Sequence, residues 1–507
     1  MKFALMGTAF LFFAASAFAL PPRYGRSCPM LFGKVSNIEV WGTARVENAR
    51  NQLTELFRSS DGKLEGITLA APKDPLGQYQ FPWIRDNAAS VYEIRDLPDV
   101  IEAYIKFCRL NLATKTLGSL GEPKFNPDGS AFNEPWGRPQ NDGSAYRALR
   151  WMEYTEKKLA DGNRIAALEN YSPDLSQLSV KWDLEYITHH WKDPSFDLWE
   201  EEMGAHVHTR LMMHAALEKG AILAAKLEPG GENSGAARTY RAQAEEIKKS
   251  ILLNAWNARQ GYLRSTWQHD GGFVHKMEPL DIGVIIGLLH STSGAPVFRM
   301  SDERVLSTME RLENRFLEIY RFNQRFQDPR FRGVVALGRY AEDRFHGGNP
   351  WVIATQAAGE FYYRLATTLL DEKQIVFTSV NHRFFTRLLG GEEKFKPRKR
   401  ILSGEPEFSK IIEAIVEKAN GFAEVVHSVT KGDGFHAEQF GRGYQPGDAG
   451  DWVAEYLKAM ESDGSKPLPG GDWIGARLLV WNEASFSSFW RARNAYLEKA
   501  KSLQGKF

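Results

Sequence analysis

The sequence predicts an all-α protein in which most of the 507 residues form one large helical domain. Apolar residues recur at spacings of three and four along most of the chain, which is the period of one α-helix face. Strand-like alternation of apolar and polar residues is scarce and short. No short repeat and no linker rich in Ser, Thr or Pro divides the chain. A single domain is therefore favoured over a helical solenoid, which would show a repeating unit.

Eleven stretches carry the helical period, and we expect helices near residues 42–57, 91–112, 144–159, 174–190, 203–227, 237–256, 279–289, 302–320, 349–370, 407–427 and 473–500. Stretch 91–112 places seven apolar or aromatic residues on one face, and stretch 203–227 repeats the pattern. Asn349 and Pro350 form a helix start signal, because Asn caps well and Pro is tolerated in the first turn.

Composition and charge exclude several classes of protein. Apolar residues are 43% and charged residues 25%, which is typical of a globular chain and excludes a disordered one. Lys and Arg number 64 against 63 Asp and Glu. Without an excess of positive charge to hold phosphate backbones, we expect no nucleic-acid partner. Aromatic residues are 12%, which suits sugar-binding faces and large cores equally.

The N-terminus has the pattern of a secretory signal peptide. Lys2 precedes an apolar run over residues 3–15, and Ala17-Phe18-Ala19 matches a small-residue cleavage site. This run is shorter than the roughly 20 residues that span a membrane. We therefore expect residues 1–19 to be removed from a secreted or vacuolar protein without a stable membrane anchor.

A secreted protein can form disulfides and carry N-linked glycans, and the sequence decides neither question. Cys28 and Cys108 are the two cysteines, and they either form a disulfide or remain two separate buried thiols. Asn170 begins a glycosylation sequon, Asn-Tyr-Ser, but Pro173 directly after it lowers the expected occupancy.

Long loops between the predicted helices combine Trp or Tyr with Arg, carboxylates, Gly and Pro. They cover residues 74–86, 121–143, 194–204, 339–351 and 432–450. Long structured loops in compact domains usually carry function. Most of these loops directly precede a predicted helix. If alternate helices run parallel, their N-terminal ends share one face and the loops meet there.

Carboxylates cluster in one of these loops. Asp197 and Glu200–Glu202 lie within six residues, and burial of such a cluster would raise at least one pKa, as a general acid requires. The same residues could equally be the solvated first turn of the following helix. Glu438 lies between aromatic residues. It is either structural or the second of the two carboxylates that a glycosidase places around a glycosidic bond.

Other loop residues suit sugar binding, whereas other mechanisms lack their motifs. Arg85 and Asp86 could donate to and accept from neighbouring hydroxyl groups, and Trp136 with Arg138 adds a flat face and a cation. The sequence contains no G-x-S-x-G, Walker A, G-x-G-x-x-G or H-E-x-x-H motif. His206 and His208, two residues apart, would point to different sides of a helix, so no metal site is expected.

With five loop motifs in one order, the sequence resembles the fungal-type glucoamylases, the glucan 1,4-α-glucosidases. The resemblance extends from about residue 41 to residue 490. The motifs are Y-x-x-x-W-x-R-D at 79–86, GEPKFN and WGRPQNDG within 121–143, DLWEE from 197, GRYAED with GGNPW within 338–351, and AEQF at 437–440.

The resemblance implies a fold and a mechanism. The fold would be an (α/α)6 barrel, a six-hairpin toroid with long active-site loops, and the mechanism would invert the anomeric centre without a metal or cofactor. Glu200 would be the general acid and Glu438 the general base. Asp197 is a rival proton acceptor, ranked lower because it lies only three residues from Glu200 and the base must act from across the sugar.

The resemblance also implies substrate-binding positions. Arg85 and Asp86 would hold the terminal glucose, Tyr79 would lie beside the oxocarbenium ion, and further sugar contacts would come from Trp83, Trp136, Arg138, Trp199, Glu201, Arg339 and Trp351. Departures from the family pattern affect subsite affinity and pH optimum. They are Pro82 and Ile84 around the tryptophan, Glu202 in place of an apolar residue, and Leu478 in place of an acid.

The expected function is exo-acting release of β-D-glucose from non-reducing ends of α-1,4-glucans such as starch, dextrins and glycogen. Residues 20–507 would form one catalytic domain without a starch-binding module, acting as a monomer on soluble dextrins better than on granules. A trehalase, an α-1,6-acting glucodextranase, or a non-catalytic glucan-binding or regulatory protein remains the alternative.

Overall fold

The computed structural model describes residues 38–74, 77–272, 276–291, 295–320, 322–323, 333–391, 399–430, 434–441 and 474–504. All of them belong to one compact unit, Asn37–Phe507. The expected signal peptide and Cys28 lie outside the described residues. None of the helices in the described ranges is long and apolar enough to cross a membrane.

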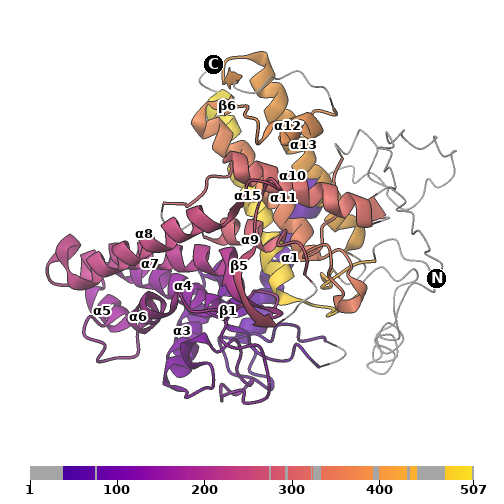
Figure 1. Cartoon of the computed structure of the whole chain (residues 1–507). Helices are drawn as coiled ribbons and strands as arrows, with labels where there is room; N and C mark the ends of the chain where they lie inside the picture. The colour runs from indigo at the N-terminus through magenta and orange to yellow at the C-terminus, as the bar shows by residue number, and fades with distance from the viewer. Residues whose placement is uncertain are drawn as a thin grey trace, which may run out of the picture. The chain divides into compact units, whose positions relative to one another are not determined.

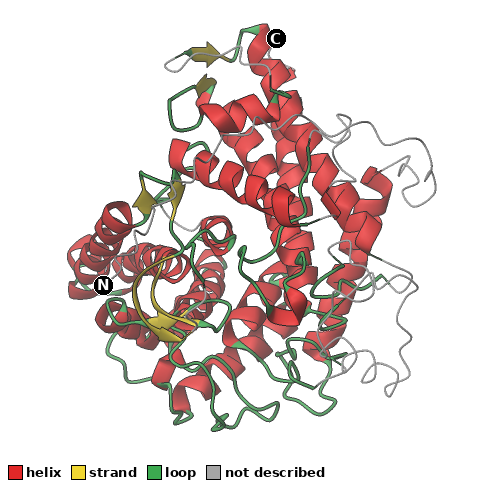
Figure 2. Cartoon of the chain, turned by 45° about the vertical axis from the view of Figure 1, so that its right-hand side comes forward, coloured by secondary structure: helices red, strands yellow, loops and turns green. Residues whose placement is uncertain are grey.

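Six helices of the described chain form a closed inner ring. Each contacts the next, and the last contacts the first: α2 (Ile84–Val91), α4 (Asp142–Ala160), α7 (Val207–Leu227), α9 (Gly283–His290), α11 (Val352–Glu372) and α15 (Val480–Gln504). Six more alternate with them along the chain: α1 (Ile38–Arg58), α3 (Pro98–Ala113), α6 (Val180–His190), α8 (Gly235–Asn254), α10 (Glu303–Ile319) and α13 (Pro406–Val429). The expected all-α (α/α)6 barrel is thereby confirmed, with helices dominating the chain (Figure 2).

The second layer of helices covers the ring from outside. Helix α8 packs along α7, as Figure 1 shows, while α1 packs on α15 and α13 packs on α11. Helix α6 contacts both α4 and α7. Two shorter helices lie on connections, α5 (Arg164–Tyr171) and α12 (His382–Leu388). Each outer helix returns the chain to the same end of the barrel, so the inner helices all begin at one end.

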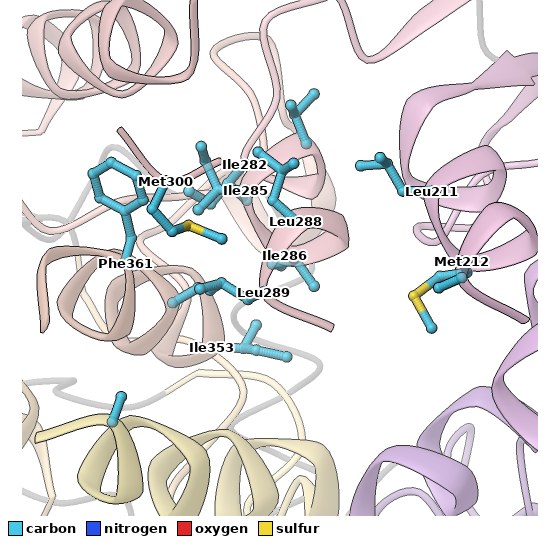
Figure 3. Close-up of a cluster of buried hydrophobic side chains, with 14 of the residues drawn as sticks. Leu211, Met212, Ile282, Ile285, Ile286, Leu288, Leu289, Met300, Ile353 and Phe361 are labelled. Atoms are coloured by element: carbon cyan, nitrogen blue, oxygen red, sulfur yellow. The ribbon is translucent and has the colours of Figure 1, made fainter. Parts of the chain in front are cut away.

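Helix α9 shows why the core lies between the inner helices. Its sequence, GVIIGLLH, is apolar on all sides, which is typical of a fully buried helix. Figure 3 shows α9 between Leu211 and Met212 of α7 and Ile353 and Phe361 of α11. A Cβ at Gly287 would lie 3.0 Å from the Cα of His208, so the glycine lets α9 and α7 approach closely.

Strands are few and short among the described residues. The largest sheet has three antiparallel strands in the order β1 (Ser195–Phe196), β2 (Glu202–His206) and β5 (Thr266–Gly272). Its register pairs Phe196 with Met203 and His206 with Thr266, with a bulge between Met203 and Ala205. The other pairs join β3 (Trp256–Asn257) to β4 (Tyr262–Leu263) and β6 (Gln374–Val376) to β7 (Arg400–Leu402).

Several helix boundaries differ from the sequence prediction. Residues 203–206 are strand rather than helix, because they pair with β5. The helix expected from 349 begins at 352, because Trp351 forms a bridge with Gln439 and donates its N–H to Leu337. Helix α2 begins at Ile84, within the loop expected over 74–86, and neither α5 nor α12 was predicted. Residues 95–97 interrupt the stretch predicted as one helix over 91–112, and α3 restarts at Pro98.

Cys108 and Asn170 are both buried in the outer part of the barrel. Cys108 is a free thiol. The Asn170 amide donates to the carbonyl of Ala166, and its oxygen accepts from Arg109 and Trp151. The folded chain therefore offers no accessible acceptor amide at this sequon.

Candidate active site

Loops that lead into the inner helices meet around one cavity of about 280 Å³. Eleven of the thirteen residues expected at the site line it: Tyr79, Trp83, Arg85, Asp86, Trp136, Trp199, Glu200, Glu201, Arg339, Trp351 and Glu438. The sequence had separated them by up to 359 positions, and the barrel brings them together because its inner helices begin at one end. Asp197 and Arg138 do not line the cavity.

Glu200 projects into the cavity from the tight turn between β1 and β2. Its backbone has a φ of +67°, in the left-handed region that is costly for a residue with a side chain. The carboxylate of Asp197 holds this turn by accepting from the N–H groups of Glu201 at 2.8 Å and Glu202 at 3.2 Å. Asp197 therefore supports the backbone that carries Glu200.

Two indole groups and one guanidinium orient the Glu200 carboxyl group. Trp136 donates its Nε1–H to one oxygen at 2.7 Å, and Trp83 donates to the other at 2.5 Å. The Nη2 of Arg85 lies 3.5 Å from the oxygen that Trp83 contacts. Both oxygens are thus fixed at the cavity wall, and 17% of the side chain remains exposed to receive a ligand.

A buried lysine lies behind these two indoles. The Nζ of Lys124 is 3.2 Å from the ring centroid of Trp136 and 4.3 Å from that of Trp83, with the rings of Phe81 and Phe132 also within 4.4 Å. Burial lowers the pKa of Lys124 to about 8, although Glu200 and Glu122 oppose the shift. Sequence reasoning left Lys124 out of the site, because the GEPKFN motif does not reveal which rings surround it.

Glu438 comes from a different loop, lines the same cavity and is fully buried. Tyr79 donates its hydroxyl to one carboxyl oxygen at 2.7 Å. Burial raises the pKa of Glu438 to about 7, while the Tyr79 hydrogen bond and the charge of Arg339 act in the opposite direction. Gly475, at φ +77°, is required here, because a Cβ at that position would lie 2.0 Å from the second carboxyl oxygen.

Two aromatic rings separate the acids. Tyr79 contacts Glu438, Trp83 contacts Glu200, and the centroids of the two rings are 5.9 Å apart. Each carboxyl group therefore contacts one ring of an aromatic pair, and all four residues line the same cavity.

Arg85 and Asp86 begin helix α2 at the cavity wall. The Nη1 of Arg85 donates to Asp142 at 2.9 Å and to Gln140 at 3.2 Å. Burial raises the pKa of Asp86 to about 6, and Arg85 beside it limits the rise. A fixed cation and an anion next to each other can bind neighbouring hydroxyl groups as donor and acceptor.

A second charged pair lies against two tryptophans. Arg339 donates from Nη2 to Glu201 at 2.8 Å, and Tyr340 donates its hydroxyl to the other oxygen of Glu201. The guanidinium lies 4.9 Å from the ring centroid of Trp351 and 5.5 Å from that of Trp199. Burial raises the pKa of Glu201, and Arg339 opposes the shift.

Four polar residues singled out in the sequence do not line the cavity. Arg138 pairs with Glu122 at 2.8 Å and donates to the carbonyls of Phe132 and Glu134, so it anchors the loop that carries Trp136. Glu202 is buried beside Lys276 at 3.5 Å rather than beside Glu200. His206 and His208 are buried histidines that bond to protein groups.

An α/α barrel with several carboxyl groups and tryptophans lining one cavity is typical of a glycoside hydrolase. The chain belongs to glycosyl hydrolases family 15, whose family model matches residues 45–486. The expected resemblance to the glucoamylases is thereby confirmed.

Similarity to known glucoamylases extends over most of the chain. The chain is 30% identical over 444 residues to Glucoamylase-1 of Schizophyllum commune, and the match covers 83% of this chain and 72% of that protein. It is 27% identical over 481 residues to the intracellular sporulation-specific glucoamylase of Saccharomyces cerevisiae, covering 86% and 80%. Its structure matches the family 15 glucoamylase of Hypocrea jecorina with a TM-score of 0.75 at 26% identity, covering 90% and 72%.

Proposed function

We propose that this protein is an exo-acting, inverting glucoamylase that releases β-D-glucose from the non-reducing ends of α-1,4-glucans. The observation that supports this most directly is that Glu200 and Glu438, 238 positions apart in the sequence, both line one cavity. Starch, dextrins, glycogen and maltooligosaccharides are the proposed substrates.

In the proposed mechanism Glu200, in its protonated form, donates its proton to the glycosidic oxygen as the bond from C1 to that oxygen breaks. Glu438, ionised, takes a proton from a water molecule whose oxygen forms the new bond to C1 from the opposite face. The attack inverts C1 and produces the β anomer. Tyr79 aligns Glu438 through its hydroxyl and offers its oxygen to the positive charge that develops on the sugar.

The remaining cavity residues are proposed to hold the chain end. Arg85 and Asp86 would bind hydroxyl groups of the terminal glucose, and Glu201 with Arg339 would bind those of the next sugar. Trp83, Trp136, Trp199 and Trp351 supply flat apolar faces that suit sugar rings. Asp197 and Arg138 would act through the turn and the loop that they hold, without touching the substrate.

The test is a glucose-release assay on maltose, isomaltose and trehalose, with NMR detection of the first anomer. We expect maltose to be cleaved fastest and β-glucose to appear first. Trehalose or isomaltose as the best substrate would support the trehalase or glucodextranase alternative. α-Glucose appearing first would exclude inversion, and no release from maltose or soluble starch would favour a non-catalytic binding protein.

Replacing the proposed acid provides the matched test within the chain. We expect Glu200→Gln to lower kcat on maltose by roughly 10²–10⁴-fold, the usual contribution of general acid catalysis, with KM within a few fold. Glu202→Gln is the control, because Glu202 is two residues away but faces Lys276. A Glu200→Gln enzyme that keeps most of its kcat would contradict the assignment.

We further propose that residues 20–507 act as one catalytic domain and that residues 1–19 direct the chain into the secretory route. The small-residue cleavage pattern at 17–19 supports this, whereas one similar protein is named intracellular. N-terminal sequencing of the purified mature protein tests the proposal. An N-terminus at Leu20 or Pro21 supports cleavage, and an intact Met1 contradicts it.

A further inference from the structure

A second cavity lies within the barrel, beyond the floor of the active site. Its volume is about 50 Å³, and side chains from α2, α4, α9, α11 and α15 and from the residues just after α2 line it. Trp481 lines both this cavity and the active-site cavity, so its indole forms the wall between them. The proposed catalytic residues do not line it.

Three guanidinium groups line this cavity, from Arg150, Arg364 and Arg491, whereas Glu93 is the one carboxylate among its described lining residues. Arg491 pairs with Glu93, and Arg364 pairs with Glu360 behind it. Arg150 has a less direct partner, Glu153, one turn further along the same helix at 3.2 Å. Each guanidinium group thus has a carboxylate partner, but Glu153 and Glu360 do not line the cavity, so its lining carries three guanidinium groups and one carboxylate.

Arg150 is the least satisfied of the three. It is 7% exposed, and its Nε is buried without a hydrogen-bond acceptor among the described residues. Its guanidinium lies 4.1 Å from the ring centroid of Tyr92, and Arg491 lies 5.0 Å from the same ring. The Trp481 Nε1–H is a second buried donor without a described acceptor. Buried donors without acceptors are costly, so these groups favour a negatively charged partner.

His290 lies beside the three arginines and has a lowered pKa. Burial lowers the pKa of His290, and His208, followed by Arg364, Arg150 and Arg491, lowers it further. His290 accordingly stays neutral and accepts from or donates to the Tyr146 hydroxyl at 2.5 Å. The histidine therefore adds no charge of its own to the cavity.

A groove on the surface of the protein adjoins this cavity. A surface groove of about 530 Å³ between the residues before α10, α11 and α15 shares Arg364, Ser488 and Arg491 with the cavity. The side chain of Arg491 is 39% exposed and that of Arg364 is 24% exposed. The groove is also lined by Asp371 and Glu372, and it adjoins the cavity at the guanidinium groups of Arg364 and Arg491.

We propose that this cavity is a binding site for a small inorganic monoanion such as chloride, held by Arg150 together with Arg364 and Arg491. The volume of the cavity selects for size, since a sugar or a nucleotide phosphate is too large for about 50 Å³. The anion would neutralise the inward-facing guanidinium charge between five elements of the inner ring. It would stabilise the barrel without taking part in the reaction.

Bromide is the direct probe, because its anomalous scattering locates it in a crystal of the full chain. We expect an anomalous peak in the cavity within hydrogen-bond distance of the Arg150 guanidinium. A crystal grown in saturating bromide that shows no peak there, or shows only water, would overturn the proposal. This measurement uses the unaltered protein and does not depend on any variant folding.

Thermal unfolding gives the second readout. Bromide should raise Tm by roughly 1–3 °C with a saturable dependence, as expected for a ligand that binds only the folded state. A bulky organic sulfonate at equal ionic strength should give no such rise. Arg150→Gln should abolish the bromide response, whereas Arg241→Gln, at an exposed position of α8, should keep it. An equal response in the wild type and Arg150→Gln would contradict the site.

Discussion

Glu438 is a residue whose proposed role conflicts with its surroundings. A general base must be ionised, yet burial raises its pKa to about 7 from an ordinary value of 4.5. The folded state therefore binds this proton more tightly than the unfolded state. Its contribution to stability is complete below about pH 4.5 and is lost as pH rises through about 7.

Glu438→Gln should consequently stabilise the protein at alkaline pH while abolishing activity. At pH 8 the raised pKa of Glu438 lowers the free energy of unfolding of the wild type by at most about 3 kcal/mol. The variant avoids this cost, because glutamine carries no charge to bury. We expect the Tm of Glu438→Gln to exceed that of the wild type at pH 8. The difference should shrink towards pH 4.5, and Tm measured across this range checks it. A difference that grows as pH falls would refute the burial argument.

The β1–β2 turn is the element that presents Glu200. The sequence predicted a helix from 203 and grouped Asp197 with the glutamates as acids. The structure instead pairs 202–206 with β5, so Asp197 and Glu202 turn inward and the left-handed backbone at Glu200 points its side chain into the cavity. Helical periodicity could not reveal this, because the partner strand lies 60 residues further on.

Asp197→Asn separates a supporting role from a catalytic one. The amide oxygen of Asn can still accept from the N–H groups of Glu201 and Glu202, so we expect kcat within about tenfold of the wild type. Asp197→Ala removes that acceptor and should lower kcat further. If Asp197 were the base, Asn would be as inactive as Glu438→Gln. Rates on maltose for the three variants decide the question.

The loop at 121–141 also supports Glu200, through the aromatic residues around Lys124. We expect Lys124→Met to lower kcat by roughly tenfold, since it removes cation–π contacts worth about 0.5–2 kcal/mol that hold the two indoles on Glu200. KM should change less, because Lys124 is buried behind the wall and does not line the cavity. Lys157→Met, on the exposed end of α4, is the matched control. An unchanged kcat in Lys124→Met would show that Lys124 does not hold the two indoles on Glu200.

At the scale of the whole molecule, the loop motifs predicted more than the helical pattern did. The segments around Arg85, Glu200 and Glu438 indicated the family and with it the barrel. Helical periodicity alone predicted a helical domain, but not the closed ring of inner helices. Neither indicated Lys124 or the arginine-lined cavity, because their surroundings arise only when helices distant in sequence pack together.

Closure of the ring depends on α15, which contacts both α11 and α2. Phe489 of α15 is fully buried against Gly359 of α11, where an added Cβ would lie 2.6 Å from its ring. Phe489→Ala should cost about 3–5 kcal/mol and lower Tm and the temperature limit of activity together. Leu253→Ala, at a side chain that is 83% exposed on α8, should leave both unchanged. A Phe489→Ala protein with normal Tm would show that the ring tolerates a gap there.

Several of the cavity loops lie just ahead of an inner helix, so the residues that hold the barrel together differ from the residues that are proposed to contact the substrate. The buried faces of the helices maintain the scaffold, while the segments ahead of them can change length and chemistry without disturbing it. Substrate preference can therefore be re-engineered one segment at a time, by transplanting residues 121–141 or 339–351 from a relative onto an unaltered barrel.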